Sequence, residues 1–258
     1  MPETLMLPYG TPFPDPFPED VKFVGCNMTH PSWEHRVPKG VRLVTTADVP
    51  RWEMRTITAT VEHTWGLIHA IHRRIIAAAA RPYSDRDLWL VPSSLSMMTI
   101  GVVGLGRIGL GVASIANAFG MRVLWSDIND EQAKAAPRHW ERLELSDLLQ
   151  KSDLVVVAIS SGQPLAGLQQ FQGELLVSIV PFHLLGIPPH TVELMLHLNR
   201  IRGAAFDDWP ADWPVDKKLV DAGRLVVTPH IGGSTLDARR LTAALVERQM
   251  YKMLWASR

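Results

Sequence analysis

Apolar residues fall into two alternating patterns from Met98 onward. Stretches in which they recur every three or four positions predict helices over 107–119, 145–151, 190–200 and 234–255. Short, almost wholly apolar runs predict strands over 99–104, 122–127, 154–160, 175–180, 202–207 and 224–228. Such strands need cover on both faces, so the pattern predicts an α/β fold, a doubly wound parallel sheet with helices on each side.

The beginning of the chain has a different pattern. Two apolar runs, Val21–Cys26 and Val41–Thr45, predict strands, and residues 58–80 predict one helix. Residues 1–20 include six prolines in the first eighteen positions, which predicts an extended arm on the surface or on a partner subunit. The predicted helix has one apolar face, made by Val61, Trp65, Ile68, Ile71 and Ile75.

The composition of the chain argues against several classes of protein, among them nucleic-acid-binding, membrane-spanning and disulfide-rich proteins. Lys and Arg number 26, as do Asp and Glu, so nothing favours a nucleic acid or an anionic membrane as partner. No apolar run reaches the roughly 18 residues of a membrane span, and the start of the chain lacks the pattern of a signal peptide. The single cysteine, Cys26, excludes an internal disulfide and favours a reducing, cytoplasmic location. His69 and His72 have metal-compatible spacing, but no further ligand cluster accompanies them, so we predict no metal.

A glycine-rich motif follows the first strand of the alternating region. Gly104-Leu105-Gly106-Arg107-Ile108-Gly109 lies between a predicted strand and a predicted helix. The first glycine permits a tight turn, the second lets a pyrophosphate approach the backbone, and the third lets helix and strand pack closely. The pyrophosphate would lie on the N–H groups that open the helix, where Arg107 adds positive charge. The alternative is a tight turn with no ligand.

An acid completes this dinucleotide motif. Asp127 ends the next strand, 18 residues after Gly109. A carboxylate there accepts hydrogen bonds from the ribose hydroxyls and repels a 2′-phosphate. Because the next three residues, Ile128 to Asp130, include no cation, the sequence favours NAD over NADP as cofactor.

A histidine occupies a similar place at the last strand of the sheet. VTPHIGGSTLDARR, residues 227–240, carries His230 between the end of an apolar strand and two glycines that begin a loop. Histidine titrates near neutral pH and suits acid/base catalysis. The alternative is a strand-end histidine that only bonds to its loop.

Four motifs in this order resemble the D-2-hydroxyacid dehydrogenases, especially the phosphoglycerate dehydrogenase-like branch. They are VEHTWGLIHAIHRR, GLGRIG with Asp127, GAAFDDWPAD and TPHIGGST, and the resemblance runs from about Val21 to the C-terminus. It implies hydride transfer between nicotinamide and C2 of a 2-hydroxy acid, in a Rossmann-type fold with a second, substrate domain.

The resemblance also implies roles for individual residues. His230 matches the family's catalytic acid/base, and Asp212 falls where the family has the carboxylate that orients it, although Asp is one methylene shorter than Glu. Asp207 matches an acid near the nicotinamide amide. We therefore predict His230 and Asp212 as catalytic, with a solvated surface carboxylate as the alternative for Asp212. The predicted cofactor-binding residues are Gly104, Gly106, Arg107, Ile108, Gly109, Asp127, Ser160, Asp207 and Gly232.

Three departures put the family's usual substrate in doubt. Pro181 falls where the family has an Arg that holds the substrate carboxylate, and His183 is the nearest substitute. The connection after the strand 154–160 is short and lacks the family's His-x-Pro turn. The family's substrate domain is larger at its N-terminus than the part that the resemblance covers, so we expect a truncated one: an extended arm (1–20), a remnant substrate domain with hinge helix (21–75), the NAD-binding domain (76–235) and a C-terminal helix (236–258).

The sequence therefore predicts an NAD-dependent oxidoreductase that acts on the CH–OH or C=O group of a small molecule at a remodelled substrate site. The resemblance further implies a homodimer. Two alternatives remain open: an NAD-binding protein without catalysis, acting as a sensor or partner subunit, and a different reaction in the same cleft.

Overall fold

The computed structural model describes residues 3–8, 10–27, 32–81, 92–159 and 164–256. The chain divides into two units, one formed by residues 1–59 and 233–258 and the other by residues 60–232. Helices are α1 (Arg51–Met54), α2 (Ala59–His72), α3 (Ile75–Ala79), α4 (Arg107–Ala118), α5 (Leu145–Lys151), α6 (Pro189–His197), α7 (Lys217–Asp221) and α8 (Leu236–Ala256).

The larger unit is built on a seven-stranded sheet. Its strand order is β10-β9-β8-β7-β4-β5-β6, and every neighbouring pair is parallel. This confirms the predicted doubly wound parallel sheet. The strands are β4 (Thr99–Val103), β5 (Arg122–Ser126), β6 (Glu141–Arg142), β7 (Leu154–Val157), β8 (Leu175–Ser178), β9 (Gly203–Phe206) and β10 (Leu225–Val227).

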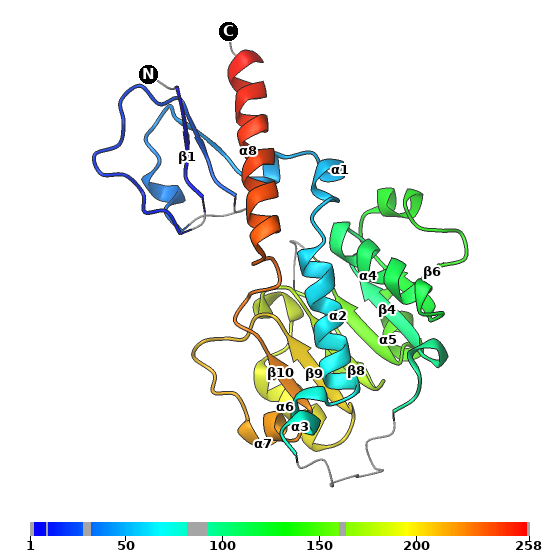
Figure 1. Ribbon diagram of the computed structural model, residues 1–258. Helices are drawn as coiled ribbons and strands as arrows, with labels where there is room; N and C mark the ends of the chain where they lie inside the picture. Colours follow the sequence, from blue (N-terminus) through cyan, green and yellow to red (C-terminus); the bar gives the residue numbers. More distant parts are fainter. Residues whose placement is uncertain (1–2, 9, 28–31, 82–91, 160–163, 257–258) are drawn as a thin grey trace. The chain divides into compact units, whose positions relative to one another are not determined.

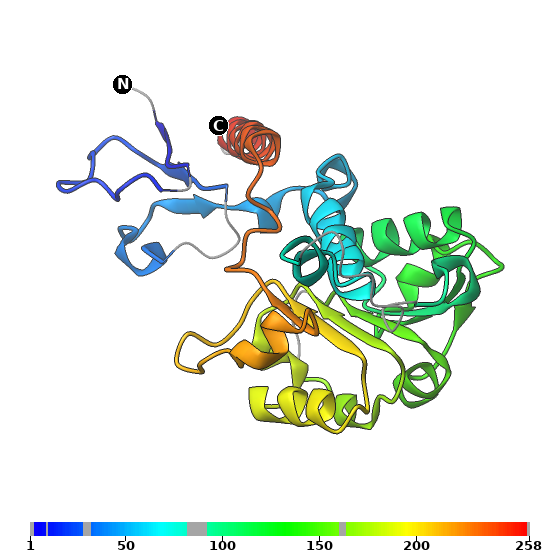
Figure 2. The ribbon, with the colours of Figure 1, turned by 60° about the horizontal axis from the view of Figure 1, so that its bottom comes forward.

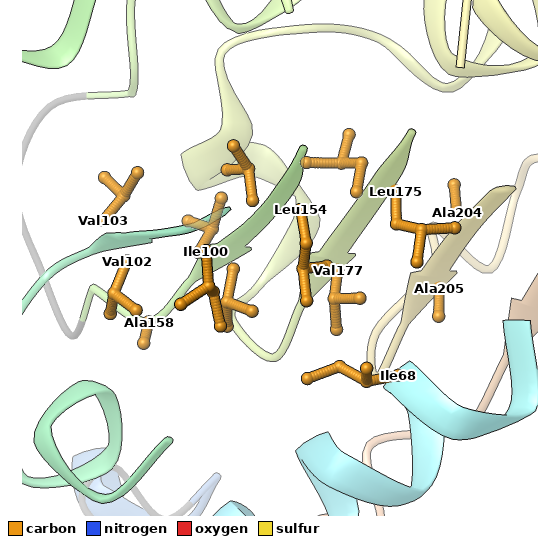
Figure 3. Packing of buried hydrophobic residues seen from close by; sticks show 14 of the residues in the cluster. Ile68, Ile100, Val102, Val103, Leu154, Ala158, Leu175, Val177, Ala204 and Ala205 are labelled. Atoms are coloured by element: carbon orange, nitrogen blue, oxygen red, sulfur yellow. The ribbon is translucent and has the colours of Figure 1, made fainter. Parts of the chain in front are cut away.

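Helices cover both faces of this sheet, with α2 and α4 on one face and α6 on the other (Figure 2). Val61 of α2 meets Gly111 of α4, which brings these two helices together. Figure 3 shows Ile68 of α2 directed at the face that carries Val177 and Ala205, and all three side chains are buried. The central strands β7, β8 and β9 are buried along their whole length, which explains their continuous apolar runs.

The helix expected over 58–80 is interrupted. Arg74 adopts a left-handed backbone conformation with φ 47°, so α2 ends at His72 and α3 begins at Ile75. The apolar face holds as far as Ile71, which is buried, whereas Ile75 beyond the break is 50% exposed. The periodicity of the sequence continues through Arg74 and therefore gave no sign of the break.

The smaller unit holds both ends of the chain (Figure 1). Its three strands, β1 (Thr4–Met6), β2 (Phe23–Gly25) and β3 (Arg42–Val44), form a parallel sheet against which α8 packs. Part of the expected N-terminal arm is thus a sheet strand, and the C-terminal helix shares a core with this sheet. That core consists of Val44, Val49, Val246 and Met250.

The unit boundaries differ from the division we expected. Residues from Thr60 onward belong with the larger sheet rather than with the remnant substrate domain, because the apolar face of α2 packs into the larger core. The C-terminal helix belongs with the N-terminal sheet, a long-range pairing that local sequence patterns do not reveal.

Candidate functional site

The strand order places a crevice at the carboxyl edge of the larger sheet. The chain leaves β4 toward β5 on one side and later returns to β7 on the other, so the order reverses between these adjacent strands. Ligands of open α/β sheets bind outside the carboxyl ends of the strands at such a switch point. The glycine motif begins directly after β4, at this point.

Each glycine of the motif has the geometry that the motif requires. Gly104 has φ +90°, and a Cβ there would lie 2.8 Å from the carbonyl oxygen of Ala158, which follows β7. A Cβ on Gly109 would collide with the carbonyl oxygen of Gly104, so the helix lies against the turn. Gly106 caps α4 and has open space where a Cβ would be. The loop is therefore a cradle with one open position at the helix N-terminus, which fits a pyrophosphate.

The first turn of α4 adds charge to the cradle. Arg107 is half-buried, and burial lowers the pKa of its guanidinium from the usual value, although arginine stays protonated in proteins. Ile108 packs on the main hydrophobic core. Ser160, the remaining cofactor residue expected after β7, lies outside the described residues.

Asp127 stands at the end of β5 and is tied to the glycine loop. Its Oδ2 accepts a hydrogen bond of 2.7 Å from Leu105 N, and its Oδ1 accepts one of 2.8 Å from Asn129 N. The carboxylate is half-buried. This position at the loop is compatible with a ribose-binding acid, and that role stays a prediction.

A cation that sequence reasoning missed lies beside Asp127. Arg142 Nη2 donates to the main-chain oxygen of Asp127 at 2.9 Å and pairs with Asp130 at 2.7 Å. The pairing of Trp125 with Arg142 across β5 and β6 brings it there. Strand β6 has two residues, too few to give a periodic signal, so only the sheet pairing reveals this arginine.

The second group of functional residues is organised by Asp207, which follows β9 and is buried. Its Oδ1 accepts hydrogen bonds from the Thr228 hydroxyl at 2.6 Å and from Ile231 N at 2.9 Å. Its Oδ2 accepts one from Gly232 N at 2.7 Å. The carboxylate therefore fixes both ends of the loop that carries His230.

His63 of α2 joins the same network. Its Nε2 lies 3.1 Å from Asp207 Oδ1 and 3.0 Å from the Thr228 hydroxyl oxygen. Because an ionised carboxylate only accepts hydrogen bonds, this nitrogen carries the proton. Sequence reasoning assigned His63 no catalytic or binding role, since its partners are more than 140 residues away.

Burial and hydrogen bonding oppose one another at Asp207. Burial alone would raise the pKa of this carboxyl group. The hydrogen bonds from His63, from Thr228 and from the N–H groups of Gly232 and Ile231 outweigh it and hold the pKa of Asp207 below its usual value. The carboxylate is thus charged at neutral pH.

His230 is presented to solvent by this anchored loop. Its side chain is exposed, and its backbone has φ 54°, a left-handed conformation that non-glycine residues seldom adopt. Such strain at an exposed histidine, held by a buried network, is typical of functional loops. Asp212 is also exposed, and no hydrogen bond or ion pair joins it to His230 among the described residues. The pairing of these two side chains stays a prediction.

The position of the family's substrate-binding arginine has aromatic surroundings. Pro181 is followed by Phe182, whose ring lies 5.3 Å from that of Phe206 and 5.1 Å from that of Trp209. Phe182 N donates to the carboxylate of Asp208 at 3.0 Å. His183, the expected substitute cation, is exposed. The turn after β8 is therefore fixed by apolar packing and one acid.

The described ranges contain neither a cluster of metal ligands nor a helix that could span a membrane. No group of three or more His, Cys, Asp or Glu side chains there has the arrangement of a metal site. No described helix is both long enough and apolar enough to cross a membrane.

Comparison with known proteins identifies the family. Residues 65–166 match the D-isomer specific 2-hydroxyacid dehydrogenase, NAD binding domain. The chain is 30% identical over 239 residues to the glyoxylate reductase of Thermococcus kodakarensis, covering 84% of this chain and 68% of that protein. This chain belongs to the D-2-hydroxyacid dehydrogenase family. The predicted family and NAD as its cofactor are thereby confirmed.

Other relatives extend this result. The chain is 32% identical over 206 residues to the D-3-phosphoglycerate dehydrogenase of Bacillus subtilis. The matched region covers 74% of this chain but only 38% of that longer protein. The structure of D-2-hydroxyisocaproate dehydrogenase has a TM-score of 0.80 at 16% identity, over 99% of this chain and 84% of that one. An acyclic imino acid reductase in complex with NADPH and D-Arg has a TM-score of 0.70 at 22% identity, over 92% and 77%. These structural likenesses show the fold.

Proposed function

We propose that this protein is an NAD-dependent oxidoreductase that acts on the CH–OH or C=O group of a small hydroxy or oxo compound. The main support for this proposal is that two groups of residues, the glycine cradle and the loop that carries His230, lie at the same edge of the larger sheet. The glycine cradle follows β4, and the His230 loop follows β10, four strand positions away in the same sheet. At about 4.8 Å between strands, roughly 19 Å separates them, a span that suits an extended dinucleotide.

In this proposal NAD, when bound, supplies or accepts the hydride. The N–H groups at the start of α4 hold the pyrophosphate, and Asp127 holds the adenosine ribose. His230 gives a proton to the carbonyl oxygen on reduction and takes it back on oxidation. Asp207 keeps the His230 loop in place, and Asp212 orients His230 once substrate is present.

The substrate side is remodelled in this proposal. A proline cannot bind a carboxylate in the bidentate way that a guanidinium does. The apolar packing of Phe182 and Trp209 beside Pro181 favours an oxo compound whose binding does not depend on an arginine that holds a carboxylate group.

We further propose that the protein is a homodimer and that it is cytoplasmic. Light scattering tests the oligomeric state, and cell fractionation tests the location.

Turnover with a panel of small 2-oxo acids and aldehydes tests the proposal, followed by NADH absorbance. We expect at least one compound to be reduced and His230→Ala to lower kcat by 100-fold or more, as loss of an acid/base group does. His139→Ala is the matched control, because His139 is exposed and bonds to Asn117, away from β10. Equal activity of wild type and His230→Ala would refute the catalytic role.

One rival function has specific support. Pro181 stands where the family has its substrate-binding Arg, and no hydrogen bond or ion pair joins His230 to Asp212 among the described residues. Both observations favour an NAD-binding protein without catalysis. That rival predicts tight NADH binding with no turnover of any compound in the panel. If a compound in the panel is turned over, His183→Ala tests the substitute cation, because a raised KM without a change in kcat would assign substrate binding to His183.

A further inference from the structure

The opposite edge of the larger sheet, where its strands begin, carries a cavity. Its volume is about 510 Å³, within the range of small-molecule sites. Asp153, Glu174, Arg202 and Arg224 line it, and each immediately precedes a strand of the sheet, β7, β8, β9 and β10. Because the strands are parallel, these residues gather at the amino edge, away from the glycine cradle and His230.

The cavity has an excess of positive charge. Four arginines and two carboxylates line it: Arg74, Arg200, Arg202, Arg224, Asp153 and Glu174. Glu174 pairs with Arg202 at 2.7 Å, and Asp153 Oδ2 accepts a hydrogen bond of 2.8 Å from Thr99 N. In a chain with equal numbers of acids and bases, this is a local concentration of cations.

Two of the arginines are held by groups that do not neutralise them. Arg224 donates to the main-chain oxygens of Arg202, Leu196 and Ile201 at 3.1, 2.6 and 3.0 Å. Arg200 donates to Gln169 O at 2.9 Å. Neither forms an ion pair with a carboxylate of the described residues, and Nη1 of Arg224 has no acceptor among them. Main-chain carbonyls thus fix the guanidinium of Arg224 while its charge stays available to a ligand.

The cations also repel one another. Burial lowers the pKa of Arg74, and the charges of Arg224, Arg202 and Arg81 lower it further. His72 contributes a neutral ring, because its Nδ1 lies 3.0 Å from Arg202 Nη2 and its Nε2 lies 3.0 Å from Ser93 O. Like charges held together in a concave site are relieved when an anion enters.

We propose that this cavity, at the amino edge of the sheet, binds a small molecule that carries a multivalent oxyanion, either phosphate or paired carboxylates. Guanidinium groups bind both in a bidentate way. The site is separate from the carboxyl edge where the dinucleotide and substrate are proposed to bind. The inference therefore stands whether or not the protein proves to be a dehydrogenase.

Calorimetric titration of the full chain with pyrophosphate and with citrate tests this inference. The buffer contains about 0.1 M salt, so that weak, screened attraction is removed. We expect binding of one or both anions, with an affinity at least 10-fold lower in Arg74→Gln/Arg200→Gln. The anion whose affinity falls further in this variant assigns the class as phosphate or carboxylate.

Two matched variants locate the anion. Arg122→Gln removes an exposed arginine on β5 that pairs with Glu141, and Arg107→Gln removes the cation at the glycine cradle. Arg122→Gln should bind both anions as the wild type does. Arg107→Gln should bind citrate as the wild type does, whereas its pyrophosphate binding is not a control, because the glycine cradle itself fits a pyrophosphate. If the double variant does not fold, Arg200→Gln alone serves, because that side chain is exposed. No binding of either anion, an unchanged affinity for both anions in the cavity variant, or a loss of citrate binding in Arg107→Gln would overturn the proposal.

Discussion

Asp207→Asn is the substitution whose effect the structure defines best. The carboxylate accepts hydrogen bonds from Thr228 Oγ1, Ile231 N and Gly232 N, and His63 Nε2 lies 3.1 Å away. An amide keeps one oxygen and places an NH₂ group against donors that then have no acceptor. Hydrogen bonds to a charged group contribute about 1.5–3 kcal/mol each, and a buried unsatisfied donor costs a similar amount.

We therefore expect Asp207→Asn to lower the free energy of unfolding by about 3 kcal/mol, after allowing for the cost of burying the charge. In a domain of this size that is a fall in Tm of about 6–12 °C. Thermal unfolding followed by circular dichroism measures it. Asp208→Asn is the control. The neighbouring acid accepts one hydrogen bond, from Phe182 N, which the amide oxygen of asparagine can still accept, so the variant should lose only about 1 kcal/mol.

The pH dependence gives an independent check on the same carboxylate. The folded pKa of Asp207 lies below its unfolded value, so its contribution is complete above about pH 4 and is lost as the pH falls through the folded pKa. The difference in Tm between wild type and Asp207→Asn should therefore shrink on acidification. A variant as stable as the wild type at pH 7 would refute the view that Asp207 anchors the His230 loop.

Three further predictions concern other parts of the larger unit. Gly109→Ala should lower Tm and abolish NADH binding, because the new methyl group collides with Gly104 O; unchanged binding by titration would contradict the close helix–strand packing. His230→Gly should raise the free energy of unfolding by about 0.5–1 kcal/mol while removing activity, because glycine adopts φ 54° without strain; a lower Tm would contradict it. His72→Gln should flatten the dependence of stability on pH, because burial and Arg202 lower the pKa of His72 from 6.5 to about 4. As the pH falls from 6.5 toward 4, the wild type loses the stability that comes from a neutral His72. Denaturant unfolding across this pH range measures it, and the same change in the free energy of unfolding with pH in both proteins would refute the prediction.

The sequence predicted the parallel sheet well because its central strands are buried on both faces. Apolar runs such as Leu154–Val157 then have no polar alternation to obscure them. The glycine cradle was also predictable from the sequence, since Gly104, Gly106 and Gly109 meet conformational and packing requirements of one turn and the helix beside it. Because these requirements are local, a short sequence motif indicates them.

The missed features depend on distant contacts. The carboxylate of Asp207 accepts hydrogen bonds from the His230 loop, and its partner His63 comes from a helix far earlier in the chain. The place of Asp207 near the nicotinamide stays a prediction. Arg142 reaches Asp127 only through the pairing of β5 with the two-residue β6. The break at Arg74 reflects a backbone conformation that no residue type in that segment demands.

Titration with NADH, followed by energy transfer from tryptophan to the nicotinamide, shows whether the glycine cradle holds a dinucleotide. We expect saturable binding in the wild type, loss of binding in Gly106→Trp, where an indole fills the open position of the cradle, and weaker binding in Asp127→Ala. NADPH should bind less tightly than NADH, although Arg142 lies beside Asp127. If neither nucleotide binds the folded protein, the cradle at the switch point holds no cofactor, and both the dehydrogenase and its non-catalytic rival are contradicted.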